Sequence, residues 1–141
     1  MPDDQEIIGG VEAFYRAYID AFNREDIDRY ADCFAPPYEL IAGGNVTTYA
    51  TESELQQYAA QTLIDLKSRG WARSTVDLLK VWPLAAQQAM ILADVTRYRG
   101  DDSIMLHARV SYIVIRTVKG WKIAAMIPLA GPFLGPGDLP R

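Results

Sequence analysis

The one histidine of the chain, His107, stands two positions before Arg109 in a stretch otherwise rich in Val, Ile and Tyr, residues 104–127. An imidazole, with an ordinary pKa of about 6.5, can take up or release a proton near neutral pH. A guanidinium can stabilise a developing oxyanion. Because polar groups among core-forming residues need partners, the partners of these two side chains decide whether they perform chemistry.

The register of the hairpin that contains His107 follows from its turn. Residues 89–99 and 104–118 alternate as β-strands do, and a two-residue turn at Asp101-Asp102 sets Arg99 opposite Ile104. Facing side chains then share one side of the sheet. The facing pairs on that side are Asp94 with Arg109, Thr96 with His107, Leu92 with Ser111 and Tyr98 with Met105, and Ile113, Ile115 and Met126 border them.

This polar patch has two interpretations. In the first, His107 acts as a general acid or base that Asp94 orients. Arg109 or Tyr18 then stabilises an oxyanion. In the second, Asp94 and Arg109 form an ordinary cross-strand ion pair, and His107 lies in an interface where it performs no chemistry. The residues alone leave both interpretations open.

Helices are predicted in three places before this hairpin. Apolar residues recur at three- and four-residue steps over 7–22, behind a capping pair of Asp3 and Glu6. Gly9 and Gly10 are poor helix formers, so the regular part is expected to begin as late as Val11. The second helix covers 27–34 and ends before Pro36-Pro37, and the third runs from a Thr51 and Glu54 capping box to Gly70.

Strands are predicted for most of the remaining chain. A short hairpin of 38–42 and 46–49 lies between the second and third helices, with its turn at Gly43-Gly44-Asn45. Residues 71–82, 89–99, 104–118 and 121–127 form the main sheet, and the last three are expected as an antiparallel meander. After Ile127 the prolines at 128, 132, 136 and 140 disfavour both helix and central strand and predict an extended arm. We therefore expect one domain, residues 1–128, and a Pro/Gly-rich arm, residues 129–141.

Composition restricts the classes of function. The net charge of −4 and the scattered Lys and Arg disfavour nucleic acid as a partner. No apolar run is long enough for a membrane span, and the acidic start lacks the features of a secretory signal, so a cytoplasmic location is expected. The single cysteine excludes an internal disulfide, and one histidine without a carboxylate cluster argues against a metal site. No cofactor is expected.

Two segments resemble a known group of proteins. Residues 13–34, AFYRAYIDAFNREDIDRYADCF, resemble the opening of SnoaL-like and ketosteroid isomerase-like proteins, which belong to the nuclear transport factor 2-like superfamily. Residues 114–126, VIRTVKGWKIAAM, are similar to the final hairpin of the same group. The resemblance implies an α+β fold, a cone-shaped roll of three N-terminal helices packed on a curved antiparallel sheet.

The functional residues of this group carry over only in part. Tyr18 matches the tyrosine that ketosteroid isomerases use as an oxyanion donor, five residues before Asn23. Their general base falls on Ala42, and their second oxyanion group falls near Ile113, so neither is present. The final strand, IAAMIP, lacks the carboxylate that limonene epoxide hydrolases require. A steroid-type isomerase or an epoxide hydrolase is therefore disfavoured.

The resemblance also bears on which side of the sheet lines the pocket. Ungapped alignment places a pocket-facing acid of the isomerases on Ile113, which shares a side with His107 and Arg109, so the polar patch is expected to line the pocket. The opposite side is even more apolar, and hydrophobicity alone would make it the core side. Both assignments stay open from sequence.

We therefore expect a SnoaL-like domain that binds a small apolar or aromatic molecule and can act as a proton-transfer enzyme of isomerase or cyclase type through His107, Asp94, Arg109 and Tyr18. The alternative is a non-catalytic binding or dimerisation module. Homodimerisation is expected in both cases, because a curved sheet with two apolar sides needs a cover on its outer face. The residues expected to bind ligand are Phe14, Tyr38, Tyr58, Trp71, Tyr98, Ser111, Ile113 and Met126.

Overall fold

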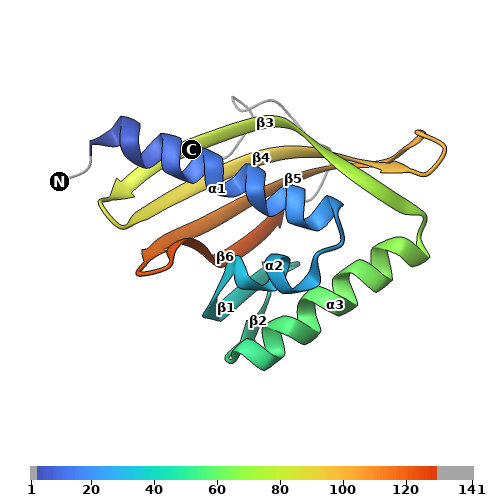
Figure 1. Ribbon diagram of the computed structural model, residues 1–141, viewed down its shortest axis with the longest axis horizontal. Helices are drawn as coiled ribbons and strands as arrows, with labels where there is room; N and C mark the ends of the chain where they lie inside the picture. Colours follow the sequence, from blue (N-terminus) through green and yellow to red (C-terminus); the bar gives the residue numbers. More distant parts are fainter. Residues whose placement is uncertain (1–2, 130–141) are drawn as a thin grey trace.

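The computed structural model describes residues 3–129, in which three helices pack on one strongly curved sheet of six strands (Figure 1). The predicted C-terminal arm, apart from Leu129, lies outside the described residues. In chain order the elements are α1 (Asp4–Asn23), α2 (Ile27–Asp32), β1 (Phe34–Ala42), β2 (Asn45–Tyr49), α3 (Glu52–Ser68), β3 (Trp71–Ala85), β4 (Gln88–Arg99), β5 (Ile104–Thr117) and β6 (Gly120–Leu129).

Helix α1 begins earlier than the glycines suggested. Asp3 caps it by accepting from the backbone N–H of Glu6 at 2.8 Å, so the helix includes Gly9 and Gly10. Close packing explains the glycine at position 10, because a Cβ there would lie only 3.2 Å from Nε1 of Trp121. The expected late start at Val11 is therefore wrong. The cap and the contact with β6 outweigh the low helix propensity of glycine.

Helix α2 is shorter than expected, and the residues after it form a strand. The helix ends at Asp32, and β1 starts at Phe34 and includes both prolines. The backbone N–H of Ile123 donates to the carbonyl of Cys33 at 2.8 Å, and Phe34 pairs with Ile123 on β6. The assignment of Phe34 to the helix was wrong, because pairing with a distant strand extends the chain there.

The sheet has the order β2-β1-β6-β5-β4-β3. The predicted meander of β4, β5 and β6 is confirmed, and so is the β1–β2 hairpin. The pairing of β1 with β6 is parallel, so the sheet is not antiparallel throughout. Strand β6 continues through Pro128 to Leu129, so the expected end of this central strand at Ile127 is wrong. Proline is tolerated there because the pairing with β1 ends at Met126, which leaves that side of the strand without a ladder partner among residues 3–129.

Two β-bulges change the predicted register at the ends of the hairpins. A shift between Arg97 and Tyr98 pairs Tyr98 with Ile104, so the expected facing of Tyr98 and Met105 is wrong. The two-residue turn that set Arg99 opposite Ile104 is wrong as well, because the backbone N–H of Arg99 donates to the carbonyl of Ser103 at 2.9 Å. A second shift separates two pairs of β5 with β6, Ile113 with Ala125 and Val114 with Ile123. Each bulge adds one residue to a strand, so the side chains beyond it exchange faces.

The core lies between the helices and the concave face of the sheet, where α1 crosses β3, β4 and β5 and α3 lies along the other end (Figure 1). Rings from all three helices and from β1 and β5 interlock there. The largest fully buried side chains are Tyr15, Tyr30, Tyr38, Leu55, Ile91, Ile123, Val11 and Val114. The Thr51 and Glu54 capping box of α3 is confirmed, with Glu54 N–H donating to Thr51 Oγ1 at 3.2 Å.

Truncating Ile123 to alanine tests the packing of β6 between β1 and β5. The side chain is completely buried, so the Ile123→Ala variant should lose about 2–5 kcal/mol of unfolding free energy in urea titrations. Val118→Ala is the control, because Val118 is fully exposed and the change should stay within about 0.5 kcal/mol. Equal effects of the two variants would contradict the central position of β6.

Candidate functional site

The polar patch predicted on the β4–β5 hairpin has the predicted register. Asp94 lies opposite Arg109, Thr96 lies opposite His107, and Leu92 lies opposite Ser111. Arg109 donates from Nε to Asp94 Oδ1 at 2.6 Å and from Nη2 to Asp94 Oδ2 at 2.8 Å. The arginine side chain is 6% exposed and the aspartate side chain 28%. The two therefore form a bidentate ion pair that is largely removed from water.

This patch lies on the face of the sheet that is turned away from the helices. The residues that alternate with it on β5 face the helices: Val110 and Tyr112 line the interior of the cone, and the Tyr112 hydroxyl lies 3.2 Å from that of Tyr15 on α1. His107 and Arg109 occupy the intervening positions. The expectation that the patch lines the cone's cavity is therefore wrong, because the more apolar side of the strand is the one that the helices cover.

His107 belongs to a short hydrogen-bonded relay on this outer face. Thr96 Oγ1 donates to Oδ2 of Asp77, and the same oxygen lies 2.9 Å from Nδ1 of His107. A hydroxyl has one proton, and here the aspartate accepts it, so Nδ1 of the imidazole donates to Thr96. Nε2 then carries the lone pair on an exposed side chain. Sequence reasoning missed Asp77 because it stands at a bulge of β3, which simple alternation does not reveal.

A small cavity lies inside the cone, between the helices and the concave face of the sheet. Its volume is about 80 Å³, roughly that of two or three water molecules. Its polar lining residues are four tyrosines, two residues with aliphatic hydroxyls and one arginine: Tyr18, Tyr30, Tyr58, Tyr112, Thr62, Ser74 and Arg97. No carboxylate and no imidazole stand among the described residues that line it. The lining therefore offers hydrogen-bond donors and a positive charge, and it lacks a strong base.

The structure brings some of the predicted ligand-binding residues to this cavity. Tyr58 and Met126 line it together with Tyr18. Tyr38 is completely buried next to it, with its hydroxyl 3.2 Å from that of Tyr58. Trp71 is also buried, and its Nε1 donates to Ser74 Oγ at 2.9 Å. Trp71 and Tyr38 therefore support the wall of the cavity from behind.

The remaining predicted ligand-binding residues lie elsewhere. Ser111 shares the outer face with Arg109, and Ile113 shares it two positions further along the strand. Tyr98 lies under the guanidinium of Arg73, 4.1 Å from the ring centroid to Cζ. Phe14 is half-buried on α1 and packs against the core. Met126 was assigned to the outer patch, but the bulge of the β5–β6 ladder turns it inward.

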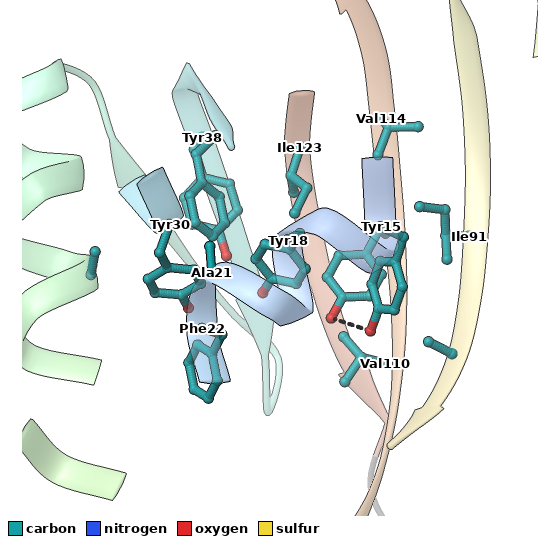
Figure 2. Packing of buried hydrophobic residues seen from close by; sticks show 14 of the residues in the cluster. Tyr15, Tyr18, Ala21, Phe22, Tyr30, Tyr38, Ile91, Val110, Val114 and Ile123 are labelled. Carbon is teal, nitrogen blue, oxygen red and sulfur yellow. Dashed lines mark hydrogen bonds between the residues drawn. The ribbon is translucent and has the colours of Figure 1, made fainter. Parts of the chain in front are cut away.

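The interior tyrosines stay protonated under ordinary conditions. Burial raises the pKa of Tyr18, Tyr30 and Tyr112 well above the usual value for a phenol, and it also raises that of Tyr15 and Tyr58. In Figure 2 the hydroxyls of Tyr15, Tyr18 and Tyr30 point to the same side of the aromatic cluster. A neutral phenol donates a hydrogen bond and is a poor proton acceptor, so these groups favour binding over proton abstraction.

Arg97 is the cavity residue that sequence reasoning missed. It follows Ile91, Ala93 and Val95 at two-residue steps along β4, all three of which are buried. That alternation places Arg97 on the helix-facing side, where it lines the cavity. The sequence contained a signal for this residue, because Arg97 continues the alternating apolar row of Ile91, Ala93 and Val95 with a charged side chain.

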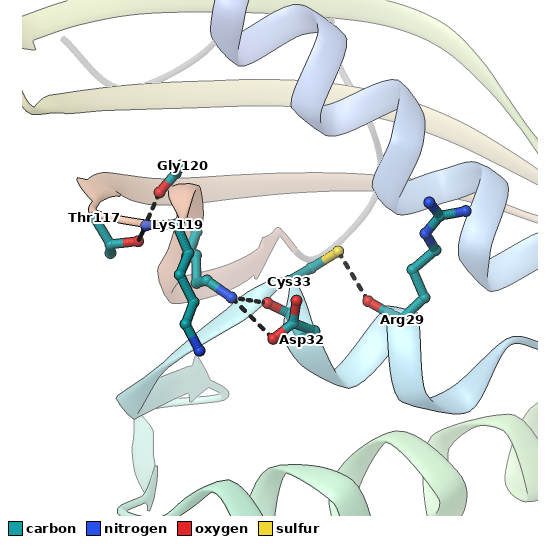
Figure 3. A network of polar contacts seen from close by, with 7 residues as sticks. Arg29, Asp32, Cys33, Thr117, Lys119 and Gly120 are labelled. Carbon is teal, nitrogen blue, oxygen red and sulfur yellow. Dashed lines mark hydrogen bonds and ion pairs between the residues drawn. The ribbon is translucent and has the colours of Figure 1, made fainter.

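Two wider grooves lie on the surface outside the cone. One, of about 790 Å³, separates α2 from the β5–β6 turn, and Figure 3 shows Asp32 and Lys119 on its two sides. Lys122 Nζ donates to Asp32 Oδ1 at 3.0 Å there. The other, of about 650 Å³, lies between β2 and α3 and shares Tyr58 and Thr62 with the cavity. Acidic and basic groups balance in the first groove, so it favours neither sign of ligand.

The described part of the chain contains neither a cluster of metal ligands nor a helix that could span a membrane. Residues 3–129 contain no group of three or more His, Cys, Asp or Glu side chains that could hold a metal ion. None of the helices described is long and apolar enough to cross a bilayer.

The sequence matches the model of one protein family over residues 5–131, which is described as NTF2-like protein (DUF6841). The chain belongs to this NTF2-like family. The membership confirms the superfamily that the aromatic first helix and the final hairpin indicated. A search of curated proteins finds no match to the sequence.

Solved structures agree on the NTF2-like fold at low sequence identity. A protein of unknown function with a cystatin-like fold from Nostoc punctiforme is 16% identical, with a TM-score of 0.72 over 94% of this chain and 96% of that one. An NTF-2 like protein of unknown function from Shewanella oneidensis is 17% identical, with a TM-score of 0.68 over 85% and 96%. A ketosteroid isomerase-like protein from Erwinia carotovora atroseptica is 17% identical, with a TM-score of 0.63 over 89% and 98%. These likenesses establish the α+β cone fold of this NTF2-like chain and leave its ligand open.

The tautomer of His107 tests the relay on the outer face. Long-range ¹H–¹⁵N NMR spectra at pH 8 should show a protonated Nδ1 and an unprotonated Nε2, and the signals are unambiguous because the chain has one histidine. Thr96→Val removes the acceptor and should shift the ring toward the other tautomer. A wild-type ring protonated mainly on Nε2 would contradict the relay.

Proposed function

We propose that this NTF2-like chain is a SnoaL-like small-molecule-binding domain whose cone cavity takes up a small apolar or aromatic molecule. The observation that carries the proposal is the lining of the cavity, which is aromatic and offers hydroxyl donors that burial keeps neutral. Cavities of this composition, apolar with a few converging polar groups, are typical of ligand sites. The volume of about 80 Å³ favours a small ligand or a ligand that widens the cavity as it enters.

Binding without proton transfer is the better supported role of the cavity. A general base must lie within hydrogen-bond reach of the proton that it removes. The described residues of the lining include no carboxylate and no imidazole. Tyr18 lies in the cavity, while His107, Asp94 and Arg109 lie on the other face of the sheet. The four residues proposed for catalysis therefore do not converge on one substrate.

Proton transfer at the outer face is a second candidate, which the relay through Thr96 supports. If Asp77 and Thr96 hold His107 with its Nε2 lone pair exposed, the imidazole can act as a base toward a substrate on that face. The expected substrate would meet the exposed His107 without entering the cone. His107→Ala with unchanged turnover of a substrate, once one is found, would refute this candidate.

A dimerisation module is the candidate of a different class. A row of apolar side chains crosses the outer face of the sheet through facing pairs of β3, β4, β5 and β6: Trp82, Met90, Ile113 and Ala125. Trp82 is 41% exposed in the single chain. An exposed apolar row on a sheet favours association with a second copy, which would cover it.

Filling the cavity tests the proposed binding site. Ala108 lines the cavity, and Ala108→Leu should occupy the space that a ligand needs. NMR titration with phenol and indole should give shifts of cavity residues in the wild type and at least about tenfold weaker binding in the variant. Ala85→Leu is the control at an exposed position on β3 and should bind like the wild type. Shifts confined to residues outside the cavity would refute the proposal.

A charge in the apolar row tests the proposed homodimer. Sedimentation velocity should give twice the mass of the chain for the wild type and the mass of one chain for Trp82→Glu, because a buried unpaired carboxylate opposes association. Val118→Glu adds the same charge at a fully exposed turn and should leave the dimer intact. A wild-type protein that sediments as a single chain would contradict the dimer.

A further inference from the structure

Arg97 is a positive charge placed on the apolar side of the sheet. It lies on β4 between Ser74 of β3 and Leu106 of β5, and it lines the cone cavity. Its residue is only partly exposed, and the next residues inward on the same face, Val95 and Ala93, are buried. Arg97 therefore lies at the boundary between the surface and the apolar interior of the cone.

This arginine has no counterion within residues 3–129. Five other basic side chains of the described chain each pair with a carboxylate: Arg24, Lys67, Arg73, Arg109 and Lys122. The described basic residues without such a pair, Arg16 and Lys80 among them, are exposed to water, whereas Arg97 is only partly exposed. No ion pair and no hydrogen bond links the Arg97 guanidinium to another described residue, and no carboxylate lines the cavity around it. A partly desolvated charge without a counterion is unfavourable, and an arriving anion would relieve that cost.

Donors surround the position that such an anion would take. The charge of Arg97 acts on the hydroxyls of Tyr15, Tyr30 and Tyr58, where it partly opposes the rise in pKa that burial causes. Tyr30 and Tyr58 line the same cavity as the guanidinium. Protonated phenols and a guanidinium are all donors, and together they match an oxyanion that can accept several hydrogen bonds.

We propose that Arg97 binds the carboxylate of the ligand, so that the cone cavity selects small monocarboxylic acids with an apolar or aromatic body. This inference rests on the proposed binding function of the cavity. One guanidinium balances one negative charge, and the chain has a net charge of −4 that disfavours more highly charged anions. The cavity of about 80 Å³ fits a carboxylate head with a short apolar body, and a longer body would extend past Tyr58 toward the groove between β2 and α3.

Paired ligands that differ only in charge test the carboxylate preference. Benzoate and benzyl alcohol share a ring, as do phenylacetate and 2-phenylethanol, and acetate and isobutyrate provide smaller acids. NMR titrations of the wild-type chain should place all bound ligands in the cavity, with each aromatic acid bound on the order of ten to a hundred times more tightly than its alcohol. Arg97→Gln should remove that preference and leave the binding of the alcohols unchanged.

Three further variants separate charge from folding. Arg97→Lys keeps the charge and should retain part of the acid preference, although it lacks the planar fork of the guanidinium. Arg116→Gln removes an exposed arginine of β5 and should bind both members of each pair like the wild type. Thermal unfolding of Arg97→Gln should match or exceed that of the wild type, since the residue has no described partner to lose. If Arg97→Gln does not fold, Arg97→Met replaces it, because methionine keeps an apolar chain similar in length to the aliphatic part of arginine.

The outcomes distinguish this inference from the function on which it rests. Alcohols and acids that bind in the cavity with equal affinity, in the wild type and in Arg97→Gln alike, would overturn the role of Arg97 and leave the binding function standing. Absence of any cavity shift with all six compounds would overturn both. Acid binding that persists in Arg97→Gln and vanishes in Arg109→Gln would place the anion on the outer face and also overturn the inference.

Discussion

Side chains alternate between the two faces of β4 and β5, and this alternation divides the polar groups of the protein into two sets that cannot meet. Tyr112 and Arg97 face the helices, whereas Asp94, His107 and Arg109 face away from them. The division is robust, because the inward row of these strands is buried by the aromatic residues of α1 and α2. Any reaction that requires both sets would need a substrate reaching around the sheet, and the protein is therefore best understood one face at a time.

The sequence predicted those features that depend on local pattern. The Asp3 and Thr51 caps and the helix periodicity are interactions among near neighbours, and the structure contains each of them. The two-residue turn predicted between β4 and β5 is wrong, because Arg99 faces Ser103 across a three-residue turn. The bulge next to the turn offsets this difference, so the predicted pairing of Asp94 with Arg109 is correct. The resemblance of the first helix and the last hairpin then indicated the superfamily, which the family model confirms.

The errors arose where distant segments impose conformation. The pairing of Phe34 with Ile123 cannot be read from residues 27–37, and it converted the expected end of a helix into the start of a strand. Bulges in β3 and β6 placed Asp77 beside Thr96 and turned Met126 inward, because each adds one residue to an otherwise regular count. The choice of the pocket face was also wrong, since alignment to isomerases was given more weight than the greater hydrophobicity of the inward row.

The parallel pairing of β1 with β6 has a consequence for how the chain assembles. Strand β6 joins the β1–β2 hairpin to strands β5, β4 and β3, so it is the only link between the two halves of the sheet in the described chain. The residues that pair, Phe34 and Ile123, are far apart in sequence, and closing so long a loop makes folding slow relative to a fold built from local contacts. During synthesis on the ribosome, the edge of β1 that pairs with β6 therefore stays unpaired until residues 120–129 emerge. The protein is most prone to aggregation during this interval.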